Sequence, residues 1–483
     1  MPKGIHIVGL GPGLPGLLTV EADRLLRAAG EIYVRTSRHP TVGALPPSAT
    51  VHSFDDVYQQ HERFEQVYEE IAARVVQLGQ RTEGVVYAVP GHPLVGEASV
   101  QRVLALAEAR DIPLCIVEGL SFVEPTCSLL SLDPLHGLQI ADAMELALLH
   151  YPPFNPDAPV LLGQLYSRSL ASDVKLVLMA LYPDDHAVTL VHGAGTAEAA
   201  LCPVRLYELD RLEEIDHLTS LYVPPLAQAG SVQAFQEVVG RLRAPGGCPW
   251  DREQTHLSLR PYLLEEAYEV LDALDREDTA ALKEELGDLL LQILLHTQVA
   301  IEDGEFRMSD VVAHIVTKLK RRHPHVFGQL QVSGSDEVLV NWEHIKRQEK
   351  QHKREKGALA AVPRSMPALA RAESLQRRVA RLGFDWPDVE GAWGKVEEEW
   401  QELRRAGTEE ERHRELGDLL FALVSLAGWL DVDAECALRE AASRFAEHFA
   451  ALEHQAEAQG QDLGELTPAE WLELWAQSKG KSG

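Results

Sequence analysis

Hydrophobic and polar residues alternate in two ways along this chain, and the pattern changes near residue 230. Before that point, short apolar runs typical of buried strands alternate with helical stretches, as in GIHIVGLGPG followed by EADRLLRAAG. VVYAVPG and IPLCIVEG continue the series of strands that end in tight turns. After that point, strand signals vanish and long amphipathic helices rich in Glu, Leu, Ala and Arg take over. The pattern predicts an α/β domain followed by an all-α region.

Two breaks in the pattern divide the chain into three expected domains. The segment QAGSVQ is the expected linker between the α/β domain and the helices, and a second break near PRSMPAL interrupts the helical region. A chain of 483 residues is also too long for a single hydrophobic core. We therefore expect domains at residues 1–225, 230–355 and 365–483.

The two helical segments repeat each other. The first reads YLLEEAYEVLDAL and then ALKEELGDLLLQILLH, and the second reads GKVEEEWQELRRA and then RHRELGDLLFALVSLAG. Each repeat carries two pairs of carboxylates spaced three residues apart: Glu266, Glu269, Glu285 and Asp288 in the first, and Glu399, Glu402, Glu415 and Asp418 in the second. Residues three apart share a helix face. Two antiparallel helices joined by a short turn would therefore bring both pairs together.

Clustered carboxylates point to a bound cation. Four such groups repel one another strongly unless a cation lies among them, and oxygen-only ligands are what Mg²⁺ prefers. The alternative is a pair of solvated helix faces, which is the better reading of a single E-x-x-E. Here the ELGD string recurs, with an apolar run after it and an E-x-x-E helix before it both times. The repetition predicts a Mg²⁺ site that handles a polyphosphate.

Charge and composition narrow the choice of partners. The formal net charge of −29 argues against stable binding to nucleic acid, so a polyanionic substrate must be met by local cations or metal. Five scattered cysteines without a C-x-x-C pair fit a reduced cytoplasm and offer no zinc ligand set. The start of the chain does not read as a signal peptide, and no apolar run approaches the roughly 20 residues of a membrane helix. We expect a soluble, cytoplasmic protein that binds no membrane.

The helical region resembles a known enzyme family. GGCPWDREQTHLSLRPYLLEEAYEVLDAL, KEELGDLLLQILLHTQVA and KLKRRHPHVFG resemble the first half of the MazG-type nucleoside triphosphate pyrophosphohydrolases. LGFDWPDVEGAWGKVEEEWQEL and RELGDLLFALVSLAGWLDVD resemble their second half. The resemblance covers roughly residues 230–480. It implies an all-α homodimer that uses Mg²⁺ to cleave nucleoside triphosphates into monophosphate and pyrophosphate, with the eight carboxylates as metal ligands.

The same resemblance implies roles for further residues. Lys395 and Arg444 would contact the nucleotide, and Trp475 matches a family tryptophan near the C-terminus. Trp250, in CPWD, either stacks on a base or packs in the core, and we favour packing in the core. In this chemistry Mg²⁺ lowers the pKa of a bound water, a free carboxylate takes its proton, and cations stabilise the leaving pyrophosphate.

The two repeats differ in the cations that follow the carboxylate helices. The first has Lys318, Arg321 and Arg322 at one helical spacing. The aligned positions in the second are Arg444, Glu447 and His448. Charge therefore favours the first repeat for phosphate binding, whereas the family resemblance places activity in the second. Both repeats stay candidates for the active site.

The N-terminal region carries glycine loops. Gly9, Gly11 and Gly13 lie in VGLGPG directly after a predicted strand, where glycines let backbone N–H groups approach a ligand closely. Together with LLTVEADRLLRAAGEIYV they resemble the tetrapyrrole (corrin/porphyrin) methylase family, which binds S-adenosylmethionine between two α/β lobes. YAVPGHPLVGEAS and VEGLSFVEP match its second and third loops. The second loop here carries Pro90, Gly91, His92 and Pro93, and the third carries Gly119 and Ser121. By this resemblance the cofactor would be bound by Gly9, Gly11, Gly13, Pro90, Gly91, His92 and Ser121.

The sequence thus predicts a two-part protein. Its main activity is Mg²⁺-dependent hydrolysis of nucleoside triphosphates between the α and β phosphates, with an S-adenosylmethionine-binding, methylase-like domain attached. A first alternative is an S-adenosylmethionine-dependent methyltransferase whose helical half serves dimerisation or nucleotide sensing. A second is a catalytically silent nucleotide sensor. The base and sugar preferred and the methyl acceptor stay open.

Overall fold

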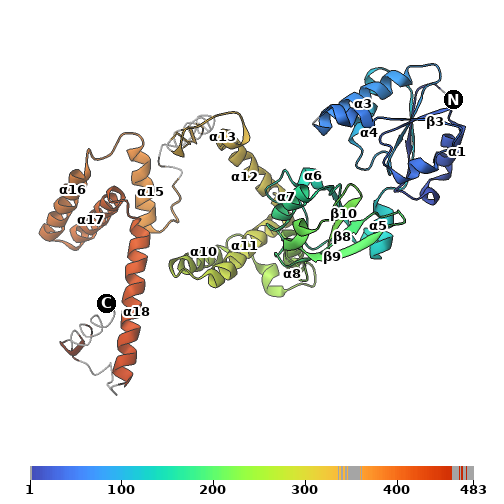
Figure 1. Cartoon of the computed structure of the whole chain (residues 1–483). Coiled ribbons are helices and arrows are strands. Elements are labelled where there is room, and N and C mark those ends of the chain that lie inside the picture. Colours follow the sequence, from blue (N-terminus) through green and yellow to red (C-terminus); the bar gives the residue numbers. More distant parts are fainter. Residues whose placement is uncertain are drawn as a thin grey trace. The chain divides into compact units, whose positions relative to one another are not determined.

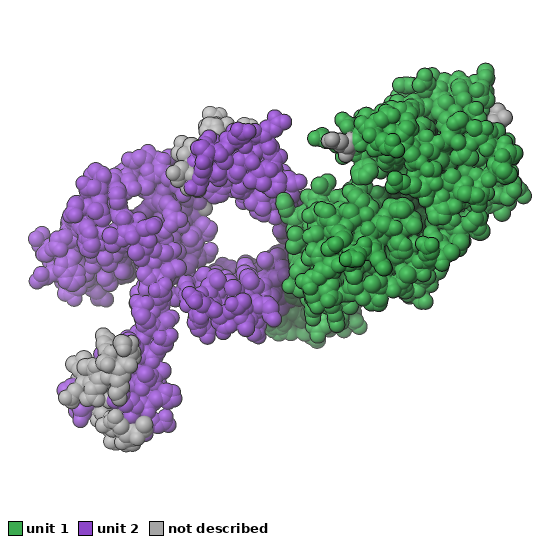
Figure 2. Space-filling view, viewed as in Figure 1, with its two compact units in different colours: residues 1–253 green, residues 254–483 purple. Residues whose placement is uncertain are grey.

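The computed structural model describes most of the chain in two compact units. The described residues are 3–61, 63–335 and 362–458, together with the positions 337, 338, 341, 342, 345, 359, 467, 469–471 and 475. The units are residues 1–253 and 254–483, drawn in green and purple in Figure 2. The first unit is α/β, and the described part of the second is helical, which confirms the fold class predicted from the sequence.

The first unit begins with a five-stranded parallel sheet. Its strands are Ile5–Gly9 (β1), Glu31–Val34 (β2), Thr50–Ser53 (β3), Val85–Val89 (β4) and Leu114–Val117 (β5). Its helices are Val20–Ala28 (α1), Asp55–Gln60 (α2), Phe64–Gly79 (α3), Ala98–Ala109 (α4) and Val123–Leu130 (α5). The strand order β3-β2-β4-β1-β5 places β1 beside β4. The chain leaves these two central strands toward opposite edges of the sheet, and such a switch point is where α/β sheets commonly bind ligands.

Alternate residues of β1 enter two separate cores, because successive side chains of a strand point to opposite faces. Ile5 and Ile7 pack in a cluster with residues of α3 and α4. Val8 packs in a second cluster with residues of α1, such as Leu26. Helices therefore cover both faces of this sheet, and α1 and α3 are both visible beside it in Figure 1.

A second five-stranded sheet follows in the same unit. Its strands are Gln139–Asp142 (β6), Val160–Gly163 (β7), Ala187–His192 (β8), Ala200–Arg205 (β9) and Thr219–Val223 (β10), in the order β6-β7-β10-β8-β9. Within the described residues, β6 and β7 pair in parallel and the other neighbouring strands of this sheet pair antiparallel. The helices Ala143–Leu146 (α6) and Arg168–Leu178 (α7) pack on this sheet around one apolar core. The unit is therefore two α/β lobes, as its resemblance implies.

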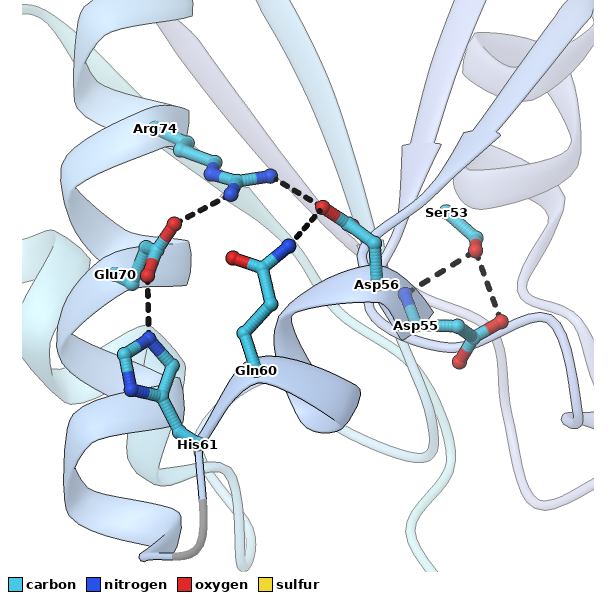
Figure 3. Close-up of polar contacts among 7 residues, drawn as sticks. All are labelled: Ser53, Asp55, Asp56, Gln60, His61, Glu70 and Arg74. Carbon is cyan, nitrogen blue, oxygen red and sulfur yellow. Dashed lines mark hydrogen bonds and ion pairs between the residues drawn. The ribbon is translucent and has the colours of Figure 1, made fainter.

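Surface ion pairs fix the short helix α2 against α3. Arg74 of α3 pairs with Asp56 of α2 at 2.8 Å and with Glu70 one helical turn away (Figure 3). His61, which follows α2, lies 2.5 Å from the other oxygen of Glu70. Exposed pairs of this kind stabilise a fold only slightly. Their effect here is positional, because α2 carries Tyr58, whose hydroxyl accepts a hydrogen bond from Arg35 at 3.5 Å.

The helical region is built of hairpins and longer single helices. In the first repeat the helices are Arg260–Asp275 (α10), Thr279–Glu302 (α11), Met308–Arg322 (α12) and Pro324–Phe327 (α13). In the second they are Ala368–Ala380 (α15), Val389–Arg405 (α16), Glu409–Trp429 (α17) and Ala434–Ala458 (α18). Two preceding helices, Val232–Arg243 (α8) and Pro249–Glu253 (α9), are grouped with the first compact unit. The domain limits expected from the sequence stay a prediction.

N-terminal capping residues determine where the second helix of each hairpin begins. The Asp278 carboxylate accepts hydrogen bonds from the backbone N–H groups of Ala280 and Ala281 at 3.0 Å, which starts α11. Thr408 and Glu411 form a capping box that starts α17. In each hairpin the connection is therefore short, and the helices run antiparallel. Within the described residues, no helix is both long enough and apolar enough to cross a bilayer.

Candidate metal centres and glycine loops

The hairpin of α10 and α11 brings the carboxylates of the first repeat together. Glu266, Glu285 and Asp288 each offer an oxygen atom within 4.8 Å of the others. Glu269 joins them: burial raises the pKa of Glu266, and so do its hydrogen bond to Glu269 and the charge of Asp288. Burial and the neighbouring Glu269 likewise raise the pKa of Glu285. All four expected ligands thus lie in one cluster, while their role as ligands stays a prediction.

The hairpin of α16 and α17 forms a second cluster that carries its own cations. Glu399, Glu415 and Asp418 offer oxygen atoms within 4.8 Å of one another. Lys395 Nζ lies 2.6 Å from Glu399 Oε1, and Arg414 Nη2 lies 2.5 Å from Glu415 Oε1. The other oxygen of Glu399 is buried and has no hydrogen-bond partner. A buried carboxylate oxygen in this state suits a divalent cation, so the donor set of the second repeat also fits Mg²⁺.

Glu269 and Glu402 lie at different distances from the turns of their hairpins. In the first repeat α10 ends six residues after Glu269, and α11 begins six residues before Glu285, so these two carboxylates lie at the same height. In the second repeat α17 also begins six residues before Glu415, but α16 ends only three residues after Glu402. Glu399, one turn earlier, therefore takes the place opposite Glu415. Among the described residues, neither group of three carboxylates includes the second residue of its E-x-x-E pair, Glu269 or Glu402, and the role of Glu402 as a ligand stays a prediction.

The expected phosphate-binding cations lie on the helices that follow the hairpins. Lys318, Arg321 and Arg322 occupy the last two turns of α12, a helix without a buried residue. Arg444 lies on α18, where it pairs with Glu440 at 3.5 Å. Lys395, by contrast, lies on α16 itself and contacts a carboxylate of the second cluster. Roles in phosphate binding for all five cations stay predictions.

The two tryptophans have different surroundings. Trp250 is 52% exposed on α9, a five-residue helix with no buried residue, so the expectation that it packs in the core is wrong. Its stacking on a base stays a prediction. Trp475 packs against α18, with its ring centroid 5.1 Å from that of Phe445. That contact favours a structural role, and a role in nucleotide binding stays untested.

Three glycine loops meet at the carboxyl ends of the central strands. The backbones of Gly11 and Gly91 exchange hydrogen bonds of 3.2 and 2.8 Å. A Cβ atom on Gly9 would lie 2.6 Å from the carbonyl oxygen of Gly91 and 2.7 Å from the backbone nitrogen of Gly119. Gly13 has a φ of 151°, which side chains rarely allow. The structure thus joins the three loops that the sequence singles out.

The side chains of these loops mainly support the loops themselves. His92 Nδ1, two residues after Pro90, accepts a hydrogen bond from the backbone N–H of Leu94 at 3.1 Å. The Ser121 hydroxyl donates to Glu124 at 2.7 Å and accepts from the N–H of Val123 at 3.0 Å. Contacts of these residues with a cofactor stay predictions.

Sequence reasoning missed a buried ion pair beside the loops. Arg35 Nε lies 3.4 Å from Glu97 Oε1, and the Glu97 side chain is only 5% exposed. Burial raises the pKa of Glu97 to about 7, and the charge of Arg35 only partly offsets this. His39 is also buried, and burial lowers its pKa to about 4. Arg35 directly follows β2, and a charged residue at the end of a buried strand is the signal that was available.

Known proteins share both halves of this architecture. The model of the Tetrapyrrole (Corrin/Porphyrin) Methylases matches residues 4–210, and that of the MazG nucleotide pyrophosphohydrolase domain matches residues 254–327. The Bacillus subtilis (strain 168) protein YabN is 40% identical over 99% of this chain and 99% of its own length. The nucleoside triphosphate pyrophosphohydrolase/pyrophosphatase MazG of Thermotoga maritima is 44% identical over 51% of this chain and 96% of its own length. The nucleoside triphosphate pyrophosphohydrolase of Escherichia coli (strain K12) is 44% identical over 50% of this chain and 94% of its own length. The chain therefore belongs to the YabN family, and it joins a tetrapyrrole methylase domain to a MazG nucleotide pyrophosphohydrolase domain.

Proposed function

We propose that the helical half hydrolyses nucleoside triphosphates to monophosphates and pyrophosphate with Mg²⁺. The observation that carries this proposal is the cluster of Glu266, Glu285 and Asp288, whose oxygen atoms lie within 4.8 Å of one another. Carboxylates at this spacing repel one another, a divalent cation among them relieves that repulsion, and an all-oxygen donor set suits Mg²⁺. The named activity of the Thermotoga maritima and Escherichia coli relatives gives the reaction.

The side chains of the first repeat supply most of what this reaction needs. Bound Mg²⁺ neutralises phosphate charge and lowers the pKa of a coordinated water. Glu266, Glu285 and Asp288 would hold the ion. Glu269 lies against Glu266 and Glu285 without belonging to the group of three, which places it to accept a proton from water. Lys318 and its neighbours on α12 would stabilise charge on the leaving pyrophosphate.

Product analysis tests the bond that is cleaved. A panel of ribo-, deoxy- and damaged nucleoside triphosphates, incubated with the full chain and Mg²⁺, should give monophosphate and pyrophosphate, and chelation should abolish turnover. Release of diphosphate and orthophosphate would contradict the proposal. Tight nucleotide binding without pyrophosphate release would instead support the silent sensor. Methyl transfer without any triphosphate turnover would support the methyltransferase alternative.

Metal binding should distinguish the two repeats. Glu269→Ala removes a carboxylate from within the first cluster, so we expect its Mn²⁺ affinity to fall by about 10–100-fold. Glu402→Ala changes a residue one turn away from the second cluster, so we expect a change of only a few-fold there. Titration followed by the electron paramagnetic resonance of free Mn²⁺ measures both.

The matched control is Glu265→Ala, which removes an exposed carboxylate beside Glu266 and should leave Mn²⁺ binding unchanged. Pyrophosphate release by the same variants then reports which repeat turns over. Charge on α12 predicts the larger loss from Glu269→Ala, whereas the family resemblance predicts it from Glu402→Ala. Equal Mn²⁺ affinities of the Glu269→Ala and Glu402→Ala chains would show that the difference in hairpin length has no effect on the centres.

Exposed apolar side chains favour a homodimer. Every residue of α12 lies at least partly in solvent, and its apolar members Val311, Val312, Ile315, Val316 and Leu319 are 38–49% exposed. A helix with such a stripe needs a partner helix to complete a bundle. We propose that a second copy of the chain supplies it. Light scattering should give twice the monomer mass of 53.4 kDa, and a monomer throughout the micromolar range would contradict this.

The glycine loops favour S-adenosylmethionine as a second ligand. Gly9, Gly91 and Gly119 pack backbone against backbone, and the absence of side chains there lets a ligand approach the backbone closely. Calorimetry should detect S-adenosylmethionine or its demethylated product binding to the wild-type chain. Gly9→Ala should remove this binding because its Cβ forces the loops apart, while Gly16→Ala, which meets nothing within 4 Å, should not. Absence of heat with the wild type at millimolar ligand would remove the cofactor from the proposal.

A further inference from the structure

A polar stripe continues from the first carboxylate cluster along α11. Gln292 follows Asp288 by four residues and His296 follows Gln292 by four, so the three share one helix face. At 1.5 Å per residue, the stripe extends about 12 Å from Asp288 to His296. By the count that aligns Glu269 with Glu285, Gln292 lies at the height of Tyr262 on α10. The stripe therefore leads from the metal ligands toward the open end of the hairpin.

Two polar atoms of this stripe are buried without a hydrogen-bond partner. Gln292 is only 5% exposed, and its amide oxygen has no hydrogen-bond partner. His296 Nδ1 lies 2.8 Å from His256 Nδ1, with the rings stacked at 5.1 Å, and its Nε2 is buried without a partner. Buried polar atoms are nearly always paired, because an unpaired one destabilises the fold. An unpaired amide oxygen one helical turn from the carboxylate cluster therefore indicates a missing hydrogen-bond donor.

The second repeat has no such stripe at the matching positions of α17. The residues four and eight positions after Asp418 are Ala422 and Leu426, which are 6% and 4% exposed. On α16, the position that matches Tyr262 in the repeated motif holds Lys395, which pairs with Glu399. The two matching positions of α17 are thus occupied by buried apolar side chains. The buried amide of Gln292 and the partly buried imidazole of His296 therefore distinguish the first repeat from the second.

We propose that Gln292, supported by His296, recognises the nucleoside part of a triphosphate bound at the first carboxylate cluster. This inference rests on the proposed function, because phosphates at the cluster would direct the sugar and base along the stripe. The Gln292 amide oxygen accepts a hydrogen bond from a donor of the nucleoside, either a sugar hydroxyl or a base N–H. Sites that hydrogen-bond a substrate group discriminate strongly against analogues that lack it.

The test compares Gln292→Met with Gln298→Met in the full chain. Met has nearly the volume of Gln and lacks the amide, while Gln298 lies on the same helix, where its amide donates to the exposed Glu302 at 3.0 Å. Both variants are made in an Asp418→Asn background, which weakens the second cluster. Calorimetry with Mg²⁺ follows two probes: an α,β-methylene nucleoside triphosphate, which is not cleaved between the α and β phosphates, and inorganic tripolyphosphate.

We expect Gln292→Met to weaken binding of the nucleotide analogue by at least about tenfold and to leave tripolyphosphate binding unchanged. Its thermal midpoint without ligand should stay equal or rise, because a buried unpaired amide has gone. Gln298→Met should match the parent chain throughout. Nucleotide analogues that differ in the ribose 2′-hydroxyl or in one base N–H then identify the donor. If the parent chain binds the analogue with that group more tightly and Gln292→Met does not, the group is the one that Gln292 binds.

Other results would overturn the inference. Unchanged nucleotide binding in Gln292→Met would show that Gln292 does not contact the nucleoside. Equal loss of tripolyphosphate and nucleotide binding, with a lowered thermal midpoint, would assign Gln292 a structural role. A parent chain that binds neither probe would overturn the proposed function, and this inference with it, whereas the first two results overturn the inference alone.

Discussion

Repulsion between carboxylates that are forced together is the interaction on which the helical half depends. Antiparallel helices joined by a short turn bring acidic side chains of α10 and α11 close together. The first repeat holds Glu266, Glu285 and Asp288 within 4.8 Å of one another, with Glu269 beside them. Like charges at this spacing make a strong field for a divalent ion. The two repeats differ in how this repulsion is balanced.

In the second repeat, basic side chains of the hairpin itself balance part of this repulsion. Lys395 and Arg414 reach Glu399 and Glu415, so part of the negative charge is balanced before any ion binds. In the first repeat, the neighbouring charges that shift the pKa of Glu266 and of Glu285 are those of other carboxylates. An incoming ion there meets free carboxylate oxygen, whereas in the second repeat it competes with side chains. Similar motifs thus predict two centres of different affinity.

Much of this arrangement could be predicted from the sequence, because it depends on short-range periodicity. The three-residue spacing of Glu266 and Glu269, and the apolar runs of β1 and β4, are local patterns that survive in the fold. The exact residues at which helices end cannot be predicted from such short-range periodicity. Glu402 lies three residues before the end of α16, whereas Glu269 lies six residues before the end of α10, and the motif spacing alone does not show that difference.

Contacts between residues that are far apart in the chain could also not be predicted from the sequence. Arg35 and Glu97 are far apart along the chain and meet only because β2 and the N-terminus of α4 lie at the same end of the sheet. Gln292 looks like one polar residue in an apolar run, DLLLQILLH, and only its burial without a partner makes it informative. Trp250 shows the reverse error, since an apolar side chain was expected inside and lies half in solvent.

Lys395 has a consequence for the second hairpin when no ion is bound. Its ammonium group lies 2.6 Å from Glu399, so it lowers the electrostatic cost of holding that carboxylate in a buried position. In the first hairpin, the charges that act on Glu266 are those of other carboxylates. The fold of the first hairpin should therefore respond more strongly to the removal of divalent ions than the fold of the second.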